Sequence, residues 1–202
     1  MTADTIVLAT GNPGKVRDLQ DLLAGTGYEI RPQSDYAVPE AIEDGLGFVE
    51  NALIKARNAS RHTGLPAIAD DSGIAVDALN GAPGIYSARY AGKDASDEQN
   101  LQLLLEKIKQ VDDPERSARF ICLMVNVRHA DDPIPRICDG VWEGRLIHEP
   151  LGDNGFGYDP IFFVPEKNCT SAQLSADEKN SMSHRGKALK CLVKQLAKFR
   201  QR

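Results

Sequence analysis

Apolar positions recur with two different periods along this chain, which predicts a mixture of strands and helices and therefore an α/β fold. Short apolar runs bounded by turn residues are typical of buried strands, and we expect strands at residues 5–9, 66–69, 120–127 and 137–147. Apolar residues spaced three and four apart predict helices at residues 14–24, 48–57, 98–111 and 184–196.

The expected strand at residues 66–69 leads directly into two adjacent carboxylates, Asp70 and Asp71, followed by Ser72 and Gly73. We therefore expect the carboxylates at a strand end, which is where open α/β sheets bind their ligands. A hydrolase can present a metal ion and a water in this way. In an arbitrary Asp-Asp pair, turn capping and solvation are the commoner roles.

The first expected strand runs into a glycine-containing turn, Thr10 to Lys15, and then into a helix. The free N–H groups and the positive dipole end of such a helix favour phosphate, and Lys15 adds a full charge. The turn is not a P-loop, because Gly11 and Gly14 enclose two residues instead of four and Val16 follows the lysine. A phosphate site and a simple tight connection both remain open.

The expected helix at residues 48–57 has an apolar stripe that leaves Glu50 and Asn51 to one side. Both residues precede Lys55 by four to five positions. The pattern therefore allows a contact to Lys55 within the helix, and it favours an ordinary solvated face.

Two segments in the last third of the chain combine aromatic and polar residues. The loop at residues 152–163 is rich in glycine and places Phe156 and Tyr158 where a flat ring could stack. Further along, Ser183 is a good helix N-cap residue. The positive side chains close to that helix start are Lys179, His184 and Arg185. An ordinary capping or surface histidine is the simpler interpretation of His184 alone.

Composition limits the function classes. With 202 residues and 42% apolar content, we expect one domain spanning residues 1–202, with ample core. A net charge of −5 without a basic run argues against a nucleic-acid partner. The absence of a long apolar stretch or a signal-like N-terminus indicates a cytoplasmic protein without membrane contact. Four scattered cysteines without a Cys-x-x-Cys pair suggest neither a zinc site nor a disulfide framework, and we expect them to be reduced.

Six segments closely resemble, in order, the motifs of the inosine/xanthosine triphosphate pyrophosphatase family. They are TGNPGK at 10–15, FVENALIKAR at 48–57, ADDSG at 69–73, GAPGIYSARY at 81–90, FGYDP at 156–160 and SHRGKA at 183–188. The resemblance implies an elongated mixed β-sheet flanked by helices, with two lobes and a central nucleotide cleft. It also implies a homodimer, with the loop at residues 81–92 near the contact.

Such enzymes cleave non-standard purine triphosphates to the monophosphate and pyrophosphate. By resemblance, Asp71 is the general base and also contacts Mg²⁺, together with Glu43 and with Asp70 as a supporting carboxylate. The resemblance places the substrate's phosphates against Thr10, Gly11, Asn12, Pro13, Gly14, Lys15, Lys55 and Ser72. It places the base against Phe156, Gly157, Tyr158, Asp159, Lys179, His184 and Arg185. The roles fit the preference of Mg²⁺ for oxygen ligands.

Two further classes of function remain open. One is a nucleoside triphosphatase of different specificity, which either releases phosphate or acts on modified pyrimidine nucleotides. The other is a nucleotide-binding module without catalysis. The intact carboxylates argue against the second class, because a binding protein has no need of a group that activates water.

Overall fold

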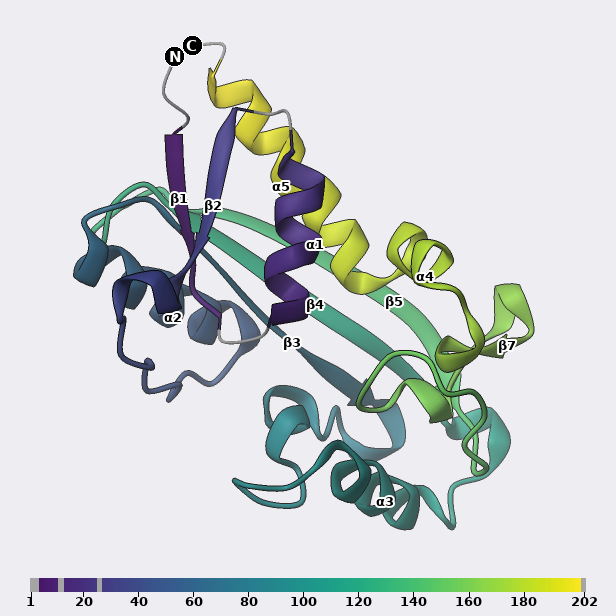
Figure 1. The fold of residues 1–202 in the computed structure, drawn as a ribbon. Coiled ribbons are helices and arrows are strands. Elements are labelled where there is room, and N and C mark those ends of the chain that lie inside the picture. Colours follow the sequence, from purple (N-terminus) through teal and green to yellow (C-terminus); the bar gives the residue numbers. More distant parts are fainter. Residues whose placement is uncertain (1–3, 11–12, 25–26, 201–202) are drawn as a thin grey trace. The chain divides into compact units, whose positions relative to one another are not determined.

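A computed structural model describes residues 4–10, 13–24 and 27–200 of the chain. It contains a seven-stranded sheet in the order β2-β1-β3-β4-β5-β6-β7. The strands are β1 Asp4–Leu8, β2 Tyr28–Pro32, β3 Ala67–Val76, β4 Ser117–Val127, β5 Arg136–Leu146, β6 Phe162–Val164 and β7 Cys169–Thr170. The sheet is mixed: β1 pairs in parallel with β2 and β3, whereas β6 pairs antiparallel with β5 and β7. Figure 1 shows β1 and β2 side by side.

The α-helices are α1 Pro13–Leu23, α2 Phe48–Thr63, α3 Asp97–Ile108, α4 Ala176–Met182 and α5 His184–Arg200. Local chemistry explains their ends. Ser96 and Gln99 form a capping box at the start of α3, and α2 ends at Gly64 in the left-handed conformation that glycine adopts readily. The expected N-cap of α5 is confirmed, since the Ser183 hydroxyl accepts a hydrogen bond from the Gly186 N–H at 3.2 Å. The α/β class and four of the five α-helices were therefore predicted from the sequence, whereas β2, β7 and α4 were not.

The chain divides into two compact units. Unit 1 comprises residues 1–71, 123–139 and 188–202, and unit 2 comprises residues 72–122 and 140–187. In unit 1, buried residues of β1, α2, β3 and β4 pack together, with alanines on the α2 side at positions 52, 56 and 59. The core of unit 2 is built around leucines and isoleucines of β3 and α3 and the rings of Phe120, Trp142 and Phe162. The assignment of the whole chain to one domain stays a prediction.

The carboxylates Asp70 and Asp71 lie in the middle of β3, so the expectation that they stand at a strand end is wrong. The strand continues because residues 73–76 are again small or apolar, and Ile74 to Val76 are buried. The carboxylates therefore interrupt a strand that is apolar on both sides of them. Successive side chains of a strand point to opposite faces, which separates the partners of Asp70 from those of Asp71.

The cysteines also differ from expectation. Cys138 on β5 and Cys191 on α5 form a disulfide, with their Cα atoms 5.8 Å apart, so the prediction that all four cysteines are reduced is wrong for this pair. Cys122 and Cys169 are not part of a disulfide. The pair is separated by 53 residues, and only the packing of α5 on β5 brings it together. Spacing along the sequence could not have indicated it.

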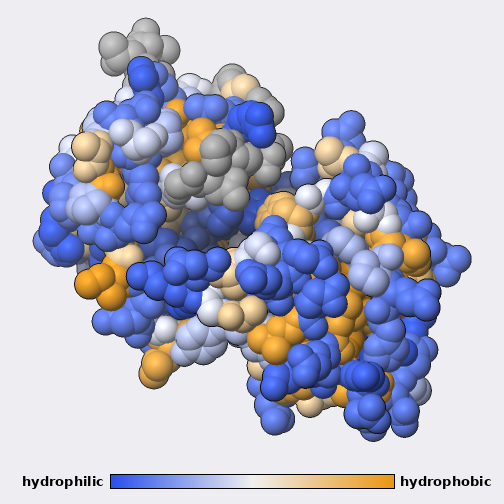
Figure 2. Space-filling model, turned by 60° about the horizontal axis from the view of Figure 1, so that its bottom comes forward, coloured by the Kyte–Doolittle hydropathy of each residue, from blue (hydrophilic) through white to orange (hydrophobic). Residues whose placement is uncertain are grey.

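Large exposed hydrophobic side chains are spread over several elements, among them Ile42, Leu46, Tyr86, Ile134 and Phe156. On the face drawn in Figure 2, hydrophilic residues predominate, and hydrophobic ones occur in separate patches. Among the described residues, no helix is long and apolar enough to span a membrane.

Asp132 organises the turn between β4 and β5 in unit 1, and we expect it to make stability depend on pH. It is fully buried and accepts hydrogen bonds from the Arg128 side chain and from the N–H groups of Arg128 and Ile134. The bonds from Arg128 hold the pKa of Asp132 far below its usual value. A depressed carboxylate pKa stabilises the folded state above the unfolded pKa of about 3.9, and this stabilisation is lost as the pH falls below it.

Asp132→Asn should therefore lower the free energy of unfolding by about 1–3 kcal/mol at pH 7, because a hydrogen bond to a charged group is lost. Urea titrations at pH 7 and pH 3 would check this, since the difference from the unchanged protein should shrink at pH 3. Asp131→Asn is the matched control, because that neighbouring side chain is 93% exposed. An equal loss at both pH values would show that the charge of Asp132 contributes nothing.

Candidate active site

A partly buried lysine joins two carboxylates in unit 1. The Lys55 ammonium on α2 lies 3.0 Å from Glu43 Oε2, in the loop before the helix, and 3.0 Å from Asp71 Oδ1 on β3. The loop turns back here because Glu50 and Asn51 of α2 accept hydrogen bonds from the N–H groups of Leu46 and Gly45. Lys55 thus contacts residues distant in sequence, and Glu50 caps the chain before its own helix instead of pairing with Lys55.

The ionisation of this cluster reflects both burial and charge. Burial lowers the pKa of Lys55, but the nearby charges of Asp71, Glu43 and Asp70 outweigh it, and the pKa is raised overall. Burial also raises the pKa of Asp71, and the attraction of Lys55 offsets only part of that effect. A carboxyl group with a raised pKa is a stronger base once ionised, which suits it to accept a proton from water.

The second carboxylate of the pair has a different partner. Asp70, only 5% exposed, forms an ion pair of 2.7 Å with Lys15 of α1. Lys15, the last residue of the predicted phosphate turn, and Asp70 of β3 are therefore adjacent within unit 1. Thr10 follows the end of β1, and its N–H donates to Leu8 O at 3.0 Å.

The remaining residues of that turn are described in part. Pro13 and Gly14 begin α1, as the helix-start prediction requires. Gly11 and Asn12 lie outside the described residues, so their predicted contacts with phosphate stay predictions.

The carboxylate oxygens of Glu43 and Asp71 in unit 1 suit a hard divalent cation such as Mg²⁺. Glu43 and Asp71 already share one cation, the Lys55 ammonium, and Mg²⁺ is commonly held by one or two carboxylates together with substrate phosphates. Among the described residues, no group of three or more His, Cys, Asp or Glu side chains is arranged to enclose a metal ion by itself. A metal held here would therefore need oxygen ligands from a substrate or from water.

The predicted base-binding residues gather in unit 2 around a pocket of about 120 Å³. The predicted site residues that line this pocket are Ser72, Phe156, Gly157, Tyr158, Asp159, Lys179, His184 and Arg185. Further lining residues, which the sequence did not indicate, include Ser87, Asp97, Asn100 and Phe120. Ser72 was expected beside the phosphates. In unit 2 its hydroxyl accepts a hydrogen bond from Arg185 at 3.2 Å.

Aromatic and cationic side chains define the chemistry of the pocket. The Phe156 ring is half exposed, with the Lys179 ammonium 5.2 Å and the Arg185 guanidinium 5.7 Å from its centroid. The His184 ring stacks on Phe120 with a centroid distance of 4.8 Å. His184 is therefore packed into the aromatic core of unit 2 and is no ordinary surface histidine. The pocket offers an exposed aromatic face and several hydrogen-bond donors.

Asp159 holds the loop of this pocket in place. Its buried carboxylate accepts hydrogen bonds from Ser171 Oγ at 2.8 Å and the Phe156 N–H at 2.9 Å, and it is also paired with Lys179. The Tyr158 hydroxyl donates to Ser87 O at 2.7 Å. These contacts are internal, so Asp159 and Tyr158 shape the loop that presents Phe156 and Gly157.

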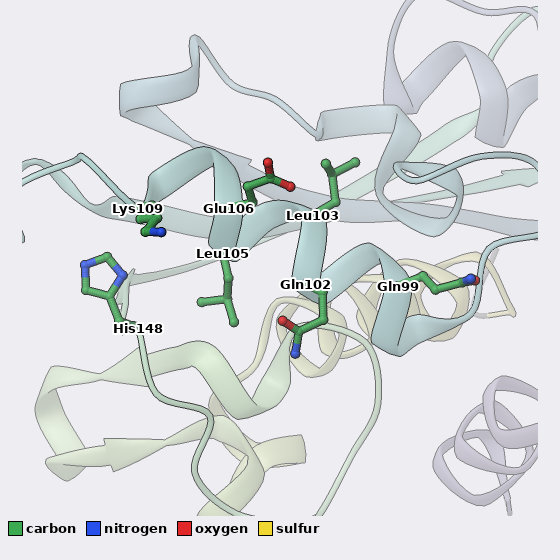
Figure 3. A pocket seen from close by; sticks show the side chains of 7 residues that line it. All are labelled: Gln99, Gln102, Leu103, Leu105, Glu106, Lys109 and His148. Carbon is green, nitrogen blue, oxygen red and sulfur yellow. The ribbon is translucent and has the colours of Figure 1, made fainter.

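A larger hollow in unit 2, of about 760 Å³, lies along α3 (Figure 3). It is lined by Gln99, Gln102, Leu103, Leu105, Glu106, Lys109 and His148. None of these residues belongs to the motifs quoted above. Chemistry, and not volume, therefore identifies the smaller pocket as the candidate site.

The sequence analysis assigned no role in the site to Asn51, Asp97 or Asn100 and noted Asn51 only as a possible neighbour of Lys55. Single amide and acid side chains on amphipathic helices resemble ordinary solvated positions. Asn51 is only 1% exposed. Asn100 is 2% exposed and bridges the Ala91 N–H and Ala88 O. The one signal for Asn51 in the sequence was its position one helical turn before Lys55.

Comparison with known proteins gives the family. Residues 6–195 match the Ham1 family. A dITP/XTP pyrophosphatase from Thioalkalivibrio sulfidiphilus is 62% identical over 191 residues, which cover 95% of this chain and 97% of that protein. One from Shigella flexneri is 60% identical, covering 93% and 95% of the two chains. A solved HAM1 protein from Coxiella burnetii has a TM-score of 0.93 at 50% identity, over 96% of this chain and 99% of that one. The chain therefore belongs to the Ham1 family, as the six motifs predicted.

Proposed function

We propose that this protein hydrolyses non-standard purine nucleoside triphosphates, namely ITP, dITP and XTP, to the monophosphate and pyrophosphate. The names of relatives about 60% identical to it support this activity. The observation that carries the proposal is the bridge from Lys55 to Glu43 and Asp71, each at 3.0 Å. It combines a partly buried carboxylate base, a second carboxylate for a metal ion and a cation for phosphate.

Each group then has a chemical task. Asp71 accepts a proton from the water that attacks the α-phosphorus, and the pyrophosphate of the β and γ groups leaves. Lys15 and Lys55 bind the negative phosphates, aided by the N-terminus of α1. Glu43 and Asp71, with Asp70 in support, would hold Mg²⁺. When bound, that ion neutralises phosphate charge and lowers the pKa of a coordinated water.

Recognition of the base belongs to the pocket of unit 2. Phe156 offers a ring face for stacking, and such an offset stack contributes about 1 kcal/mol beyond the buried area. Lys179, His184 and Arg185 supply donors for base oxygens. Asp159 and Tyr158 act by holding the loop in which Phe156 and Gly157 lie.

Product analysis tests the reaction. The purified protein should release pyrophosphate and IMP from ITP in the presence of Mg²⁺, and chelation of the metal with EDTA should stop the release. Both products can be followed by ion-exchange chromatography. Phosphate and IDP would indicate the alternative triphosphatase, and modified pyrimidine triphosphates should be assayed beside ITP. Binding without any product would favour the nucleotide-binding module.

The assembly and location that we propose are a homodimer in the cytoplasm, where free nucleotides are found. The loop at residues 81–92 supports a contact in that region, since Tyr86 is 55% exposed and stacks only against Arg89 among the described ring and cation contacts. Exposed aromatic residues are enriched in protein interfaces. Light scattering behind size-exclusion chromatography would report a monomer if this is wrong.

A further inference from the structure

One amide side chain connects the base and the metal-binding loop of unit 1. Asn51 lies in the first turn of α2 and is 1% exposed. Its Oδ1 accepts the Gly45 N–H at 2.9 Å, and its Nδ2 donates to Asp71 Oδ2 at 3.4 Å. Gly45 stands two residues after Glu43, so Asn51 touches Asp71 and the loop that carries the second proposed metal ligand.

The hydrogen bonds determine which way the amide points. Rotating it by 180° would oppose its NH₂ group to the Gly45 N–H and its oxygen to the Asp71 carboxylate. Both contacts would then be repulsive, because a backbone N–H only donates and an ionised carboxylate only accepts. The loop also approaches α2 very closely, since a Cβ atom on Gly45 would come within 2.7 Å of Asn51 Oδ1. Asn51 is thereby fixed with its donor facing Asp71.

The two oxygens of Asp71 have different partners. Oδ1 contacts the Lys55 ammonium at 3.0 Å, and Oδ2 contacts the Asn51 amide. Two donors on separate oxygens fix the rotation of a carboxylate, which one donor cannot do. Lys55 is also the group that we expect to contact phosphate, so its position depends on the substrate. The hydrogen bond from the Asn51 side chain to Asp71 does not depend on the substrate in this way.

We propose that Asn51 is a positioning residue that orients the Asp71 carboxylate and ties it to the loop bearing Glu43. The inference rests on the proposed function, in which Asp71 is the base. Asn51 touches neither water nor phosphate in this role. Groups that orient a ligand or base through one hydrogen bond typically contribute 10–100-fold.

The decisive variant is Asn51→Asp, which keeps the size of the side chain and its acceptor for Gly45 but removes the donor to Asp71. We expect kcat to fall about 10–100-fold, with KM for ITP changed less than about threefold. The melting temperature without metal should also fall, because two carboxylates then face each other. Wild-type kcat in this variant would overturn the proposal.

A swapped pair separates positioning from stability. In the double variant Asn51→Asp with Asp71→Asn, the amide and carboxylate exchange places, so the hydrogen bond can form in the opposite direction. Its melting temperature without metal should recover most of what Asn51→Asp loses, while kcat stays as low as in Asp71→Asn alone. No recovery would show that the two side chains are not bonded, and would overturn the inference.

Asn58→Asp is the matched control. It makes the same change on the same helix, where Asn58 is only partly buried and donates an exposed hydrogen bond to Pro39 O at 2.8 Å. Its kcat should stay within about twofold of the unchanged protein. Full activity in Asp71→Asn would overturn the base role on which the inference rests. Full activity in Asn51→Asp beside an inactive Asp71→Asn would overturn the positioning role alone.

Discussion

Asp71→Asn should lower kcat by ~10²–10⁴ while leaving nucleotide binding largely intact, because general base catalysis contributes an effect of this size. Asparagine keeps the shape of the side chain, and its oxygen can still face Lys55. It cannot accept a proton from water at neutral pH. The loss should therefore fall on the chemical step and much less on the Kd for a non-hydrolysable triphosphate analogue.

The experiment combines steady-state kinetics with calorimetric titration of that analogue. Asp77→Asn makes the same substitution just after the end of β3, where Asp77 forms a half-exposed pair with Arg119. It should leave kcat within about twofold, since surface ion pairs contribute little. Unchanged turnover in Asp71→Asn would end the assignment of the base. If Asp71→Asn kept its turnover but no longer bound the analogue, Asp71 would be a binding residue and not the base.

The sequence predicted those parts of the fold that depend on local periodicity. Alternation and helical spacing located α3, β4 and β5 to within about three residues, and Ser183 marked the start of α5. The start of α2 was also predicted correctly, but this helix continues to Thr63, six residues beyond the predicted end. The sequence placed the end of β3 too early, because two adjacent carboxylates look like a turn. They stay in the strand because the lysines of α1 and α2 neutralise one carboxylate each.

Long-range pairing could not be read from the pattern. Glu50 and Lys55 are close in sequence, yet Lys55 contacts Glu43 and Asp71, and Asn51 is buried although it lies off the apolar stripe. The order of the motifs indicated which residues share a function. It did not say which carboxylate meets which lysine, because strand alternation and loop closure decide that.

The largest substrate effect should distinguish 6-oxo from 6-amino purines. Under the proposed function, kcat/KM for ITP and XTP should exceed that for ATP by about 10⁴, the discrimination typical of a site whose buried polar groups lose their partners. Arg185 and Lys179 carry only donors, and both lie within 6 Å of the Phe156 ring centre. A 6-carbonyl can accept from them, whereas a 6-amino group opposes donor to donor.

Arg185→Met tests whether the guanidinium contributes to this choice. The substitution keeps an unbranched apolar stem beside Phe156 and removes the donors, so kcat/KM for ITP should fall about 10–100-fold, as expected for loss of a charged hydrogen bond of about 1.5–3 kcal/mol. The value for ATP should hardly change, because ATP gains nothing from those donors. The ratio of kcat/KM for ITP to kcat/KM for ATP should therefore decrease, because the value for ITP falls and the value for ATP does not.

Arg119→Met controls for loss of a cation in unit 2, since Arg119 pairs with Asp77 and Glu143 instead of lining the pocket. Pyrophosphate release from ITP, XTP, ATP and GTP, measured in parallel, gives all the ratios needed. An equal fall for ITP and ATP in Arg185→Met would mean that the guanidinium acts on a part common to both nucleotides, such as phosphate or ribose. The selection of the 6-carbonyl would then have to come from Lys179, from His184 or from backbone N–H groups of the loop that Asp159 holds.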